Sequence, residues 1–243
     1  MSHIHLPDGV LPVWLWVSGF VVMTLIGAVL FRSIRKEEVS RRLPLLGMMA
    51  AVMVLGASVE IVPIAYHVNL TVISGILLGP SLTFLATLVV NVILAMFGHG
   101  GITVLGLNTL ILSLEGILGY YLFRFFWRVF KKITPAVFLA TFLALLVSTV
   151  SMIGVVSLGT SHYEEMIHQG DQQGIFELEW SKEKKDQHGT DGNKKEVNLR
   201  RFVMILLPLG FVGWILEGVI TTLIARYIYR IRPDLLSLKG VTS

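Results

Sequence analysis

The sequence predicts an all-α polytopic membrane protein with seven transmembrane helices, an external N-terminus, a cytoplasmic C-terminus and a short, broken third helix. The 243 residues are 54% hydrophobic and 15% charged, and the mean hydropathy is +0.74. A soluble domain usually carries roughly 25% charged residues. The apolar residues gather in stretches of the length that crosses a bilayer, about 20 residues, and short basic clusters separate them.

Five stretches are long enough to span a membrane: 10–31, 43–65, 103–123, 135–158 and 202–225. The first follows His and Asp rather than a basic region, so we expect a retained helix and not a cleaved signal peptide. A longer stretch, residues 68–97, is interrupted by Gly79-Pro80. Because Pro lacks a backbone donor and disfavours helix in the residue before it, this stretch forms either one kinked span or two.

The basic clusters decide between one span and two. They follow the first, the 103–123 and the last spans, and consist of Arg32, Arg35, Lys36, Arg41, Arg42, then Arg124, Arg128, Lys131, Lys132, then Arg226, Arg230 and Arg232. Positive clusters favour the cytoplasmic side, and all three lie there only if 68–97 is two spans. The third helix then has about 11 residues, too few to cross alone, so part of 66–71 should be irregular backbone. Broken segments of this kind often lie at transport sites.

The whole chain, residues 1–243, is expected to form a single membrane domain with one polar external segment, 159–199. That segment holds nine acidic residues against five lysines and little apolar content, which predicts a flexible loop or a small hairpin. It could gather cations by weak electrostatic attraction, or it could simply link two spans.

Several kinds of chemistry are excluded by what the sequence lacks. The chain has no Cys, so disulfides, iron-sulfur clusters and thiolate metal sites are ruled out. It has no phosphate-binding loop, no His-Glu-x-x-His pair and no nucleophile elbow, so we expect no enzyme, and ATP hydrolysis would require partner subunits. The basic residues set membrane topology rather than forming a surface for nucleic acid.

The N-terminus carries a candidate set of metal ligands, because His3 and His5 lie close to the amine of Met1. The amine, the amide nitrogens of Ser2 and His3 and the His3 imidazole could surround one ion in a plane. Such a tetragonal nitrogen set suits Ni(II) or Cu(II), and less simply Co(II). The alternative is an ordinary frayed terminus with two histidines.

Two internal histidines are further candidates. We expect His67 at the outer end of the second span, beside the broken helix, where the turn Pro7-Asp8-Gly9 would let the N-terminus fold back to it. It could instead be an interfacial residue that caps a helix. His99 lies in a Gly-rich loop, and we favour a supporting role for it over direct ligation.

Other polar residues could orient the ligands. A ligating His usually needs a hydrogen-bond partner that fixes its tautomer, and Asp8, Asn69 and Asn108 are candidates for that role. Glu60 and Glu217 are expected as carboxylates within the membrane, which must find partners or stay neutral. Either could hold a folded-back N-terminus or bond to a neighbouring helix.

Four ordered motifs resemble the CbiM/NikM family, the substrate-binding membrane components of cobalt and nickel energy-coupling-factor transporters. The start His5-Leu6-Pro7-Asp8-Gly9 looks like the family's His-Ile-Pro-Asp-Gly. The other three motifs are the spacing from His67 to Pro80, the stretch FGHGGITVLGLN at 97–108, and LEGVIT at 216–221. The family usually begins Met-His, whereas four residues precede His5 here, three more than in the family. Pro63-Ile64-Ala65-Tyr66 replaces a Gly-Thr-Ser-Gly approach to His67.

The resemblance implies that the N-terminal amine, a backbone amide, an N-terminal His and His67 hold one Co(II) or Ni(II) ion, the transported substrate, in a near-planar arrangement. The ligand candidates are Met1, Ser2, His3, His5 and His67. It also implies a multi-pass protein of the plasma membrane with three kinds of partner: a transmembrane coupling subunit, cytoplasmic ATPase subunits and often a small auxiliary membrane subunit. The alternative functions are a metal-binding scaffold or sensor, and a carrier of vitamins or other small molecules.

Overall fold

The computed structural model describes residues 11–32, 36–58, 60–61, 66–98, 100–160 and 199–236. Within this part the chain forms seven α-helices, one pair of short strands and a 3-10 helix. The N-terminal segment with Met1, Ser2, His3, His5 and Asp8 lies outside the described residues, as do His99 and most of the polar segment 159–199. The predictions for those residues therefore remain predictions.

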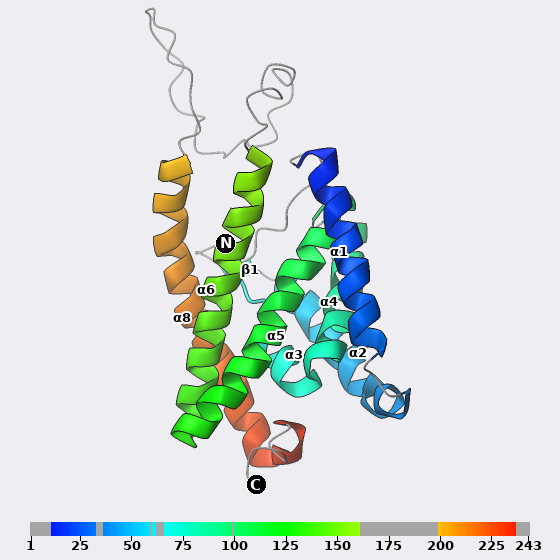
Figure 1. The fold of residues 1–243 in the computed structure, drawn as a ribbon. Helices are drawn as coiled ribbons and strands as arrows, with labels where there is room; N and C mark the ends of the chain where they lie inside the picture. The colour runs from blue at the N-terminus through cyan, green and yellow to red at the C-terminus, as the bar shows by residue number, and fades with distance from the viewer. Residues whose placement is uncertain are drawn as a thin grey trace, which may run out of the picture.

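The helices lie side by side in one bundle (Figure 1). In chain order the elements are α1 (Val13–Arg32), α2 (Lys36–Ser58), β1 (Glu60–Ile61), β2 (Tyr66–His67), α3 (Thr71–Leu78), α4 (Pro80–Met96), α5 (Leu105–Phe130), α6 (Ile133–Thr160), α8 (Leu199–Ile231) and the 3-10 helix η2 (Pro233–Leu236). Helix α5 packs against α1, α3, α4 and α6, and α8 packs against α6. The bundle is therefore organised around α5.

The predicted all-helical membrane class agrees with the lengths of these helices. Helices α1, α5, α6 and the Gly210–Ile231 part of α8 are long and apolar enough to cross a membrane. The apolar part of α2, Arg42–Ser58, and helix α4 are shorter. Large apolar side chains such as Val13, Leu25 and Val29 on α1 are exposed, as expected for helices that face lipid.

The predicted second span, 43–65, is wrong at its C-terminal end. Helix α2 ends at Ser58, and the chain then forms the antiparallel pair β1–β2, in which Glu60 is the partner of His67. The physical reason is Pro63, which cannot donate a helical hydrogen bond and disfavours helix in the residue before it. His67 therefore lies on a strand rather than at the end of a helix, and Glu60 belongs to a strand rather than to a helical span.

The stretch 68–97 forms two helices that meet at Gly79 and Pro80. Helix α3 has eight residues, and all of them are buried. It ends at Gly79, which has a φ of 79°. Pro80 is the first residue of α4, where its missing backbone N–H costs nothing because that N–H would have no partner within the helix. Residues 68–70 between β2 and α3 are not helical, and Leu70 adopts a left-handed conformation with a φ of 55°. A helix of this length is about 12 Å long.

The largest apolar cluster surrounds α3. It joins Val72 and Ile76 of α3 to Phe123 of α5 and to Ala136 and Ala140 of α6. Because α3 has no exposed face, each of its side chains contributes to this cluster or to a helix contact. The short helix therefore fills the centre of the bundle.

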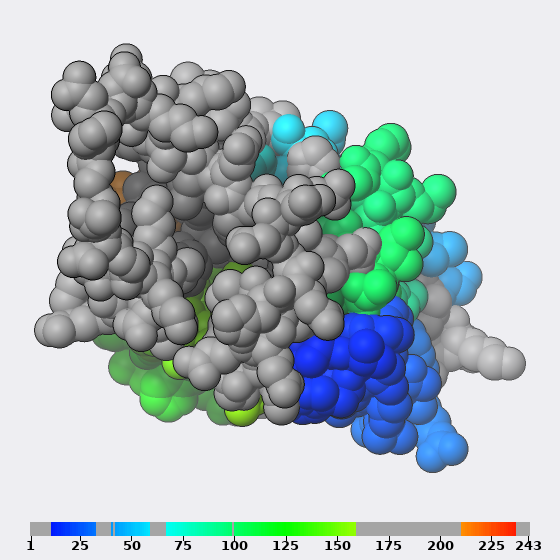
Figure 2. Space-filling model, turned by 90° about the horizontal axis from the view of Figure 1, so that it is seen from above, coloured from blue at the N-terminus to red at the C-terminus, as the bar shows by residue number. Residues whose placement is uncertain are grey.

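A smaller cluster attaches α1 to the rest of the bundle. Leu11 and Leu15 pack against Val104 and Leu107 at the start of α5. Figure 2 looks onto this end of the molecule and shows the start of α1 beside the segment that leads into α5. The cluster fixes the point from which the N-terminal segment extends.

Helices α3 and α5 approach each other at Gly75, where an added Cβ would collide with the carbonyl group of Gly116. We expect Gly75→Ala to lower the melting temperature of the purified protein by several degrees, because overpacking a core costs about 1–3 kcal/mol. Thermal unfolding in detergent measures this. The matched control is Gly154→Ala on α6, where an added Cβ meets nothing within 4 Å. Equal melting temperatures for the two variants would contradict the packing described here.

Candidate metal centre

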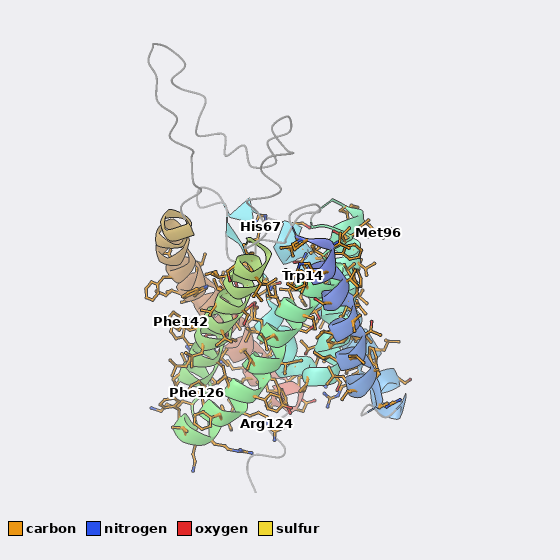
Figure 3. The ribbon with its side chains drawn as sticks, turned by 45° about the horizontal axis from the view of Figure 1, so that its top comes forward. Trp14, His67, Met96, Arg124, Phe126 and Phe142 are labelled. Carbon is orange, nitrogen blue, oxygen red and sulfur yellow. The ribbon has the colours of Figure 1, made fainter. Side chains whose placement is uncertain are left out.

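His67 lies on β2 and is half-buried. It is the one histidine among the residues that the structure describes. Figure 3 shows His67 toward the same end of the molecule as Trp14 and Met96, with Arg124 toward the opposite end. The carbonyl of Val68, the next residue, lies against Gly56 of α2. The backbone after His67 is therefore held against α2.

Asn69 connects the His67 segment to α5. Its side chain is 5% exposed, and its amide nitrogen Nδ2 donates a hydrogen bond of 3.4 Å to Oε1 of Glu115. The bond joins residues 46 positions apart in the sequence. Asn69 is two residues from His67, so the Cα atoms of these two residues are at most about 7 Å apart. The amide thus fixes one side of the His67 segment to the centre of the bundle.

Glu115 is the central polar residue of this region, although it was not among the predicted site residues. It is completely buried in α5, it accepts a hydrogen bond from Ser148 of α6, and it interacts electrostatically with Glu217 of α8. The signal was available, because Glu115 is a carboxylate inside an apolar span, the same observation that identified Glu217. A charged residue within a span is a functional candidate by default.

The structure brings together only some of the predicted supporting residues. Asn69 and Glu217 meet through Glu115, and Glu217 is completely buried. Asn108 is 6% exposed and lies two helical turns before Glu115 on α5, about 10 Å along the helix axis. Asp8 and His99 lie outside the described residues. The carboxylate pair, Glu115 and Glu217, is therefore the feature that gathers these groups.

A line of hydrogen bonds between α4 and α5 supports the same region. The hydroxyls of Thr87 and Ser113 share a bond of 2.6 Å, and the amide of Asn91 donates to the hydroxyl of Thr109 at 3.3 Å. All four side chains are buried. Paired polar groups of this kind fix the position of one helix against another.

The described residues do not contain a complete metal site. Among them, no group of three His, Asp or Glu side chains could hold a metal ion. His67 supplies one imidazole, and further nitrogen ligands would have to come from outside the described residues. The N-terminal segment contains two candidate ligands of this kind, His3 and His5, which stay predictions.

The ends of the bundle differ in charge. The C-terminal end of α1, the junction of α5 and α6, and the C-terminal end of α8 lie together at one end (Figure 1). These segments carry Arg32, Lys131, Lys132 and Arg230. His67 lies away from this basic end, toward the start of α1.

Comparisons with known proteins agree with this architecture. A protein of Haloquadratum walsbyi whose name describes it as a metal transport protein is 35% identical to this chain over 165 residues. The match covers 64% of this chain and 71% of the relative. The cobalt transport protein CbiM of Clostridium tetani is 32% identical over 145 residues, which is 56% of this chain and 58% of the relative. The crystal structure of a truncated transition metal transporter matches with a TM-score of 0.69 and 18% identity, covering 93% of this chain and 98% of that one.

The apolar helices define a multi-pass membrane protein, and its family consists of transporter components rather than catalytic enzymes. The sequence pattern described as the cobalt uptake substrate-specific transmembrane region, CbiM, matches residues 5–235. The chain therefore belongs to the CbiM family, as its four motifs predicted. The structural match at 18% identity shows the same fold.

Two buried threonines give opposite expectations for stability. We expect Thr87→Val to lower the free energy of unfolding by about 1–3 kcal/mol, because it leaves the Ser113 hydroxyl without its buried partner. Thr221 is also completely buried, but its hydroxyl has no hydrogen-bond partner among the described residues. Thr221→Val should therefore leave the melting temperature unchanged or raise it. Thermal unfolding of both variants measures this, and a loss of equal size in both would show that Thr221 has a partner.

Proposed function

We propose that this chain is the substrate-capture component of a cobalt or nickel uptake transporter of the energy-coupling-factor type. The observation that carries the proposal is the position of His67 in a chain of the CbiM family. It is a half-buried imidazole away from the basic end of the bundle, on a segment fixed to α2 and α5. An imidazole held in this way suits a first-row transition metal.

The proposed ligands are the N-terminal amine, a backbone amide, the imidazole of His3 or His5, and the imidazole of His67. Four nitrogen ligands near one plane suit Ni(II) and Co(II) better than the oxygen-preferring Mg²⁺ or Ca²⁺. The cluster of Leu11, Leu15, Val104 and Leu107 fixes the start of α1, so the ten preceding residues extend from a defined point. Folding that segment back toward His67 would complete the site.

In the proposed orientation the N-terminus is outside and the C-terminus is cytoplasmic. The grouping of the basic ends of α1, α5 and α8 at one end of the bundle supports this orientation (Figure 1), because basic clusters favour the cytoplasmic side. Metal would then enter from the side of His67.

We further propose that the chain works with partners in the plasma membrane. Its sequence has no nucleotide-binding motif, so ATP hydrolysis would occur in cytoplasmic ATPase subunits. A transmembrane coupling subunit would transmit the resulting movement, and a small auxiliary membrane subunit would complete the assembly. Release of the metal would follow reorientation of the capture component.

The proposed site predicts that the purified protein binds Ni(II) or Co(II) and that His67→Ala weakens binding by at least about 100-fold, because a chelate loses one of its four nitrogen ligands. Equilibrium dialysis measures the affinity. Extra residues added before Met1 should weaken binding as strongly, because they displace the amine. Affinity should also fall as the pH is lowered, since amines and imidazoles must be deprotonated to bind metal.

His188→Ala is the matched control for His67→Ala. It removes a histidine of the polar segment that the proposed site does not use, and its affinity should equal that of the parent protein. If His67→Ala also binds metal with the parent affinity, the proposed ligand set is wrong.

The proposed orientation can be tested with single cysteines, because the chain has none of its own. Met96→Cys and Lys131→Cys place an exposed thiol at opposite ends of the bundle. In intact cells, a membrane-impermeant maleimide should label the cysteine at position 96 but not the one at position 131. Permeabilised cells should show labelling at both. The reverse pattern in intact cells would invert the orientation.

A further inference from the structure

Two carboxylates in the interior of the bundle interact with each other. Glu115 of α5 and Glu217 of α8 are each 0% exposed, and they are close enough to interact electrostatically. Both rank among the largest fully buried side chains of the described residues. Two interacting carboxylates in an apolar bundle keep their charge only if positive charge is nearby.

The surroundings of the pair are polar on both sides. Thr71 of α3 lies against Gly116, the neighbour of Glu115, and Thr221 lies one turn after Glu217 on the same face of α8. Both threonines are 0% exposed, and neither hydroxyl has a hydrogen-bond partner among the residues that the structure describes. Buried hydroxyls are rarely left without partners. Two buried hydroxyls without a described partner therefore lie on the segments around the pair.

A direct connection runs from the pair to His67. Asn69 donates a hydrogen bond to Glu115, and its backbone is two residues from His67. Helix α3, which follows Asn69, is held against α5 by the contact of Gly75 with Gly116. The carboxylate of Glu115 thus lies on the order of 10 Å from the His67 segment.

The charge of the cargo explains why the pair is useful there. Neutral amines and imidazoles bind a divalent ion but do not cancel its charge, and an uncompensated charge is unfavourable in a low-dielectric interior. An ionised Glu115 at this distance would lower the free energy of the bound ion by Coulomb attraction without touching it, and an ionised Glu217 that interacts with Glu115 would add to the effect. The ion in turn lowers the cost of burying the two carboxylates.

We propose that Glu115 and Glu217 are the counter-charge of the metal held at His67, acting as positioning residues and not as ligands. The role rests on the proposed function, because it requires a divalent ion at His67. The counter-charge role concerns other residues than the proposed nitrogen ligands, so it can be wrong while the proposed nitrogen ligands of the metal are right.

The test measures Ni(II) affinity and the visible absorption of bound Ni(II) and Co(II) for Glu115→Gln, Glu217→Gln and the double variant. Gln keeps the shape of Glu and removes the charge. We expect each single variant to bind on the order of tenfold more weakly and the double variant more weakly still. The absorption bands should be unchanged, because the ligands are the same.

Thr141→Val is the matched control. It alters another completely buried polar side chain, on α6, whose hydroxyl donates only to the carbonyl of Val137 in its own helix. It does not change the charge, so its metal affinity should equal that of the parent protein. Glu115→Asp and Glu217→Asp retain the charge and should bind within about threefold of the parent. These two variants decide the question if a Gln variant does not fold.

If the parent protein binds metal, three results would overturn the counter-charge role alone. If the folded Gln variants bind metal with the parent affinity, the carboxylates have no electrostatic role. If the Asp variants also lose about tenfold in affinity, the shape of the side chain matters rather than its charge. A changed absorption spectrum in a Gln variant would make the carboxylate a ligand. If the parent protein itself binds neither Ni(II) nor Co(II), the proposed function fails and the counter-charge role fails with it.

Discussion

The contact between the backbones of α3 and α5 is the constraint on which the rest of the site region depends. At Gly75 and Gly116 there is no room for a side chain between the two helices. This approach lets Asn69, just before α3, reach Glu115 on α5. It also lets an eight-residue helix be buried on every side. A wider spacing would separate the His67 segment from the carboxylate pair and open a polar gap in an apolar bundle, where unpaired polar groups are costly.

Much of the fold was predictable because apolar length and proline act locally. The break at Gly79-Pro80, the short helix before it and the helical class all follow from residues that lie next to each other in the sequence. The strand pair was missed because Ile61 and the residues after it look equally apolar in a helix or a strand. Only the effect of Pro63 on the residues before it distinguishes the two conformations.

The site was predictable in part. The sequence suggested His67 from its place beside the broken helix, Asn69 as a hydrogen-bond partner for a ligating His, and Glu217 from its charge within a span. The structure brings Asn69 and Glu217 together through Glu115, and their roles in metal binding stay predictions. Glu115 was missed although it carries the same signal, because its importance comes from partners on three other segments: Asn69, Ser148 and Glu217. Contacts between residues far apart in the sequence depend on how the helices pack, and the hydrophobic pattern of a single helix does not record that.

The shortness of α3 has a consequence for the energetics of charge movement. Because α3 is only about 12 Å long, the chain before it turns within the height of the bundle, and the strand pair lies below the upper ends of α6 and α8 (Figure 1). Any cation drawn toward Glu115 therefore crosses part of the electric field of the membrane. Moving one elementary charge across the full field changes the free energy by about 2.3 kcal/mol per 100 mV. At the site proposed above, this recess would make the occupancy of a divalent ion depend on membrane voltage.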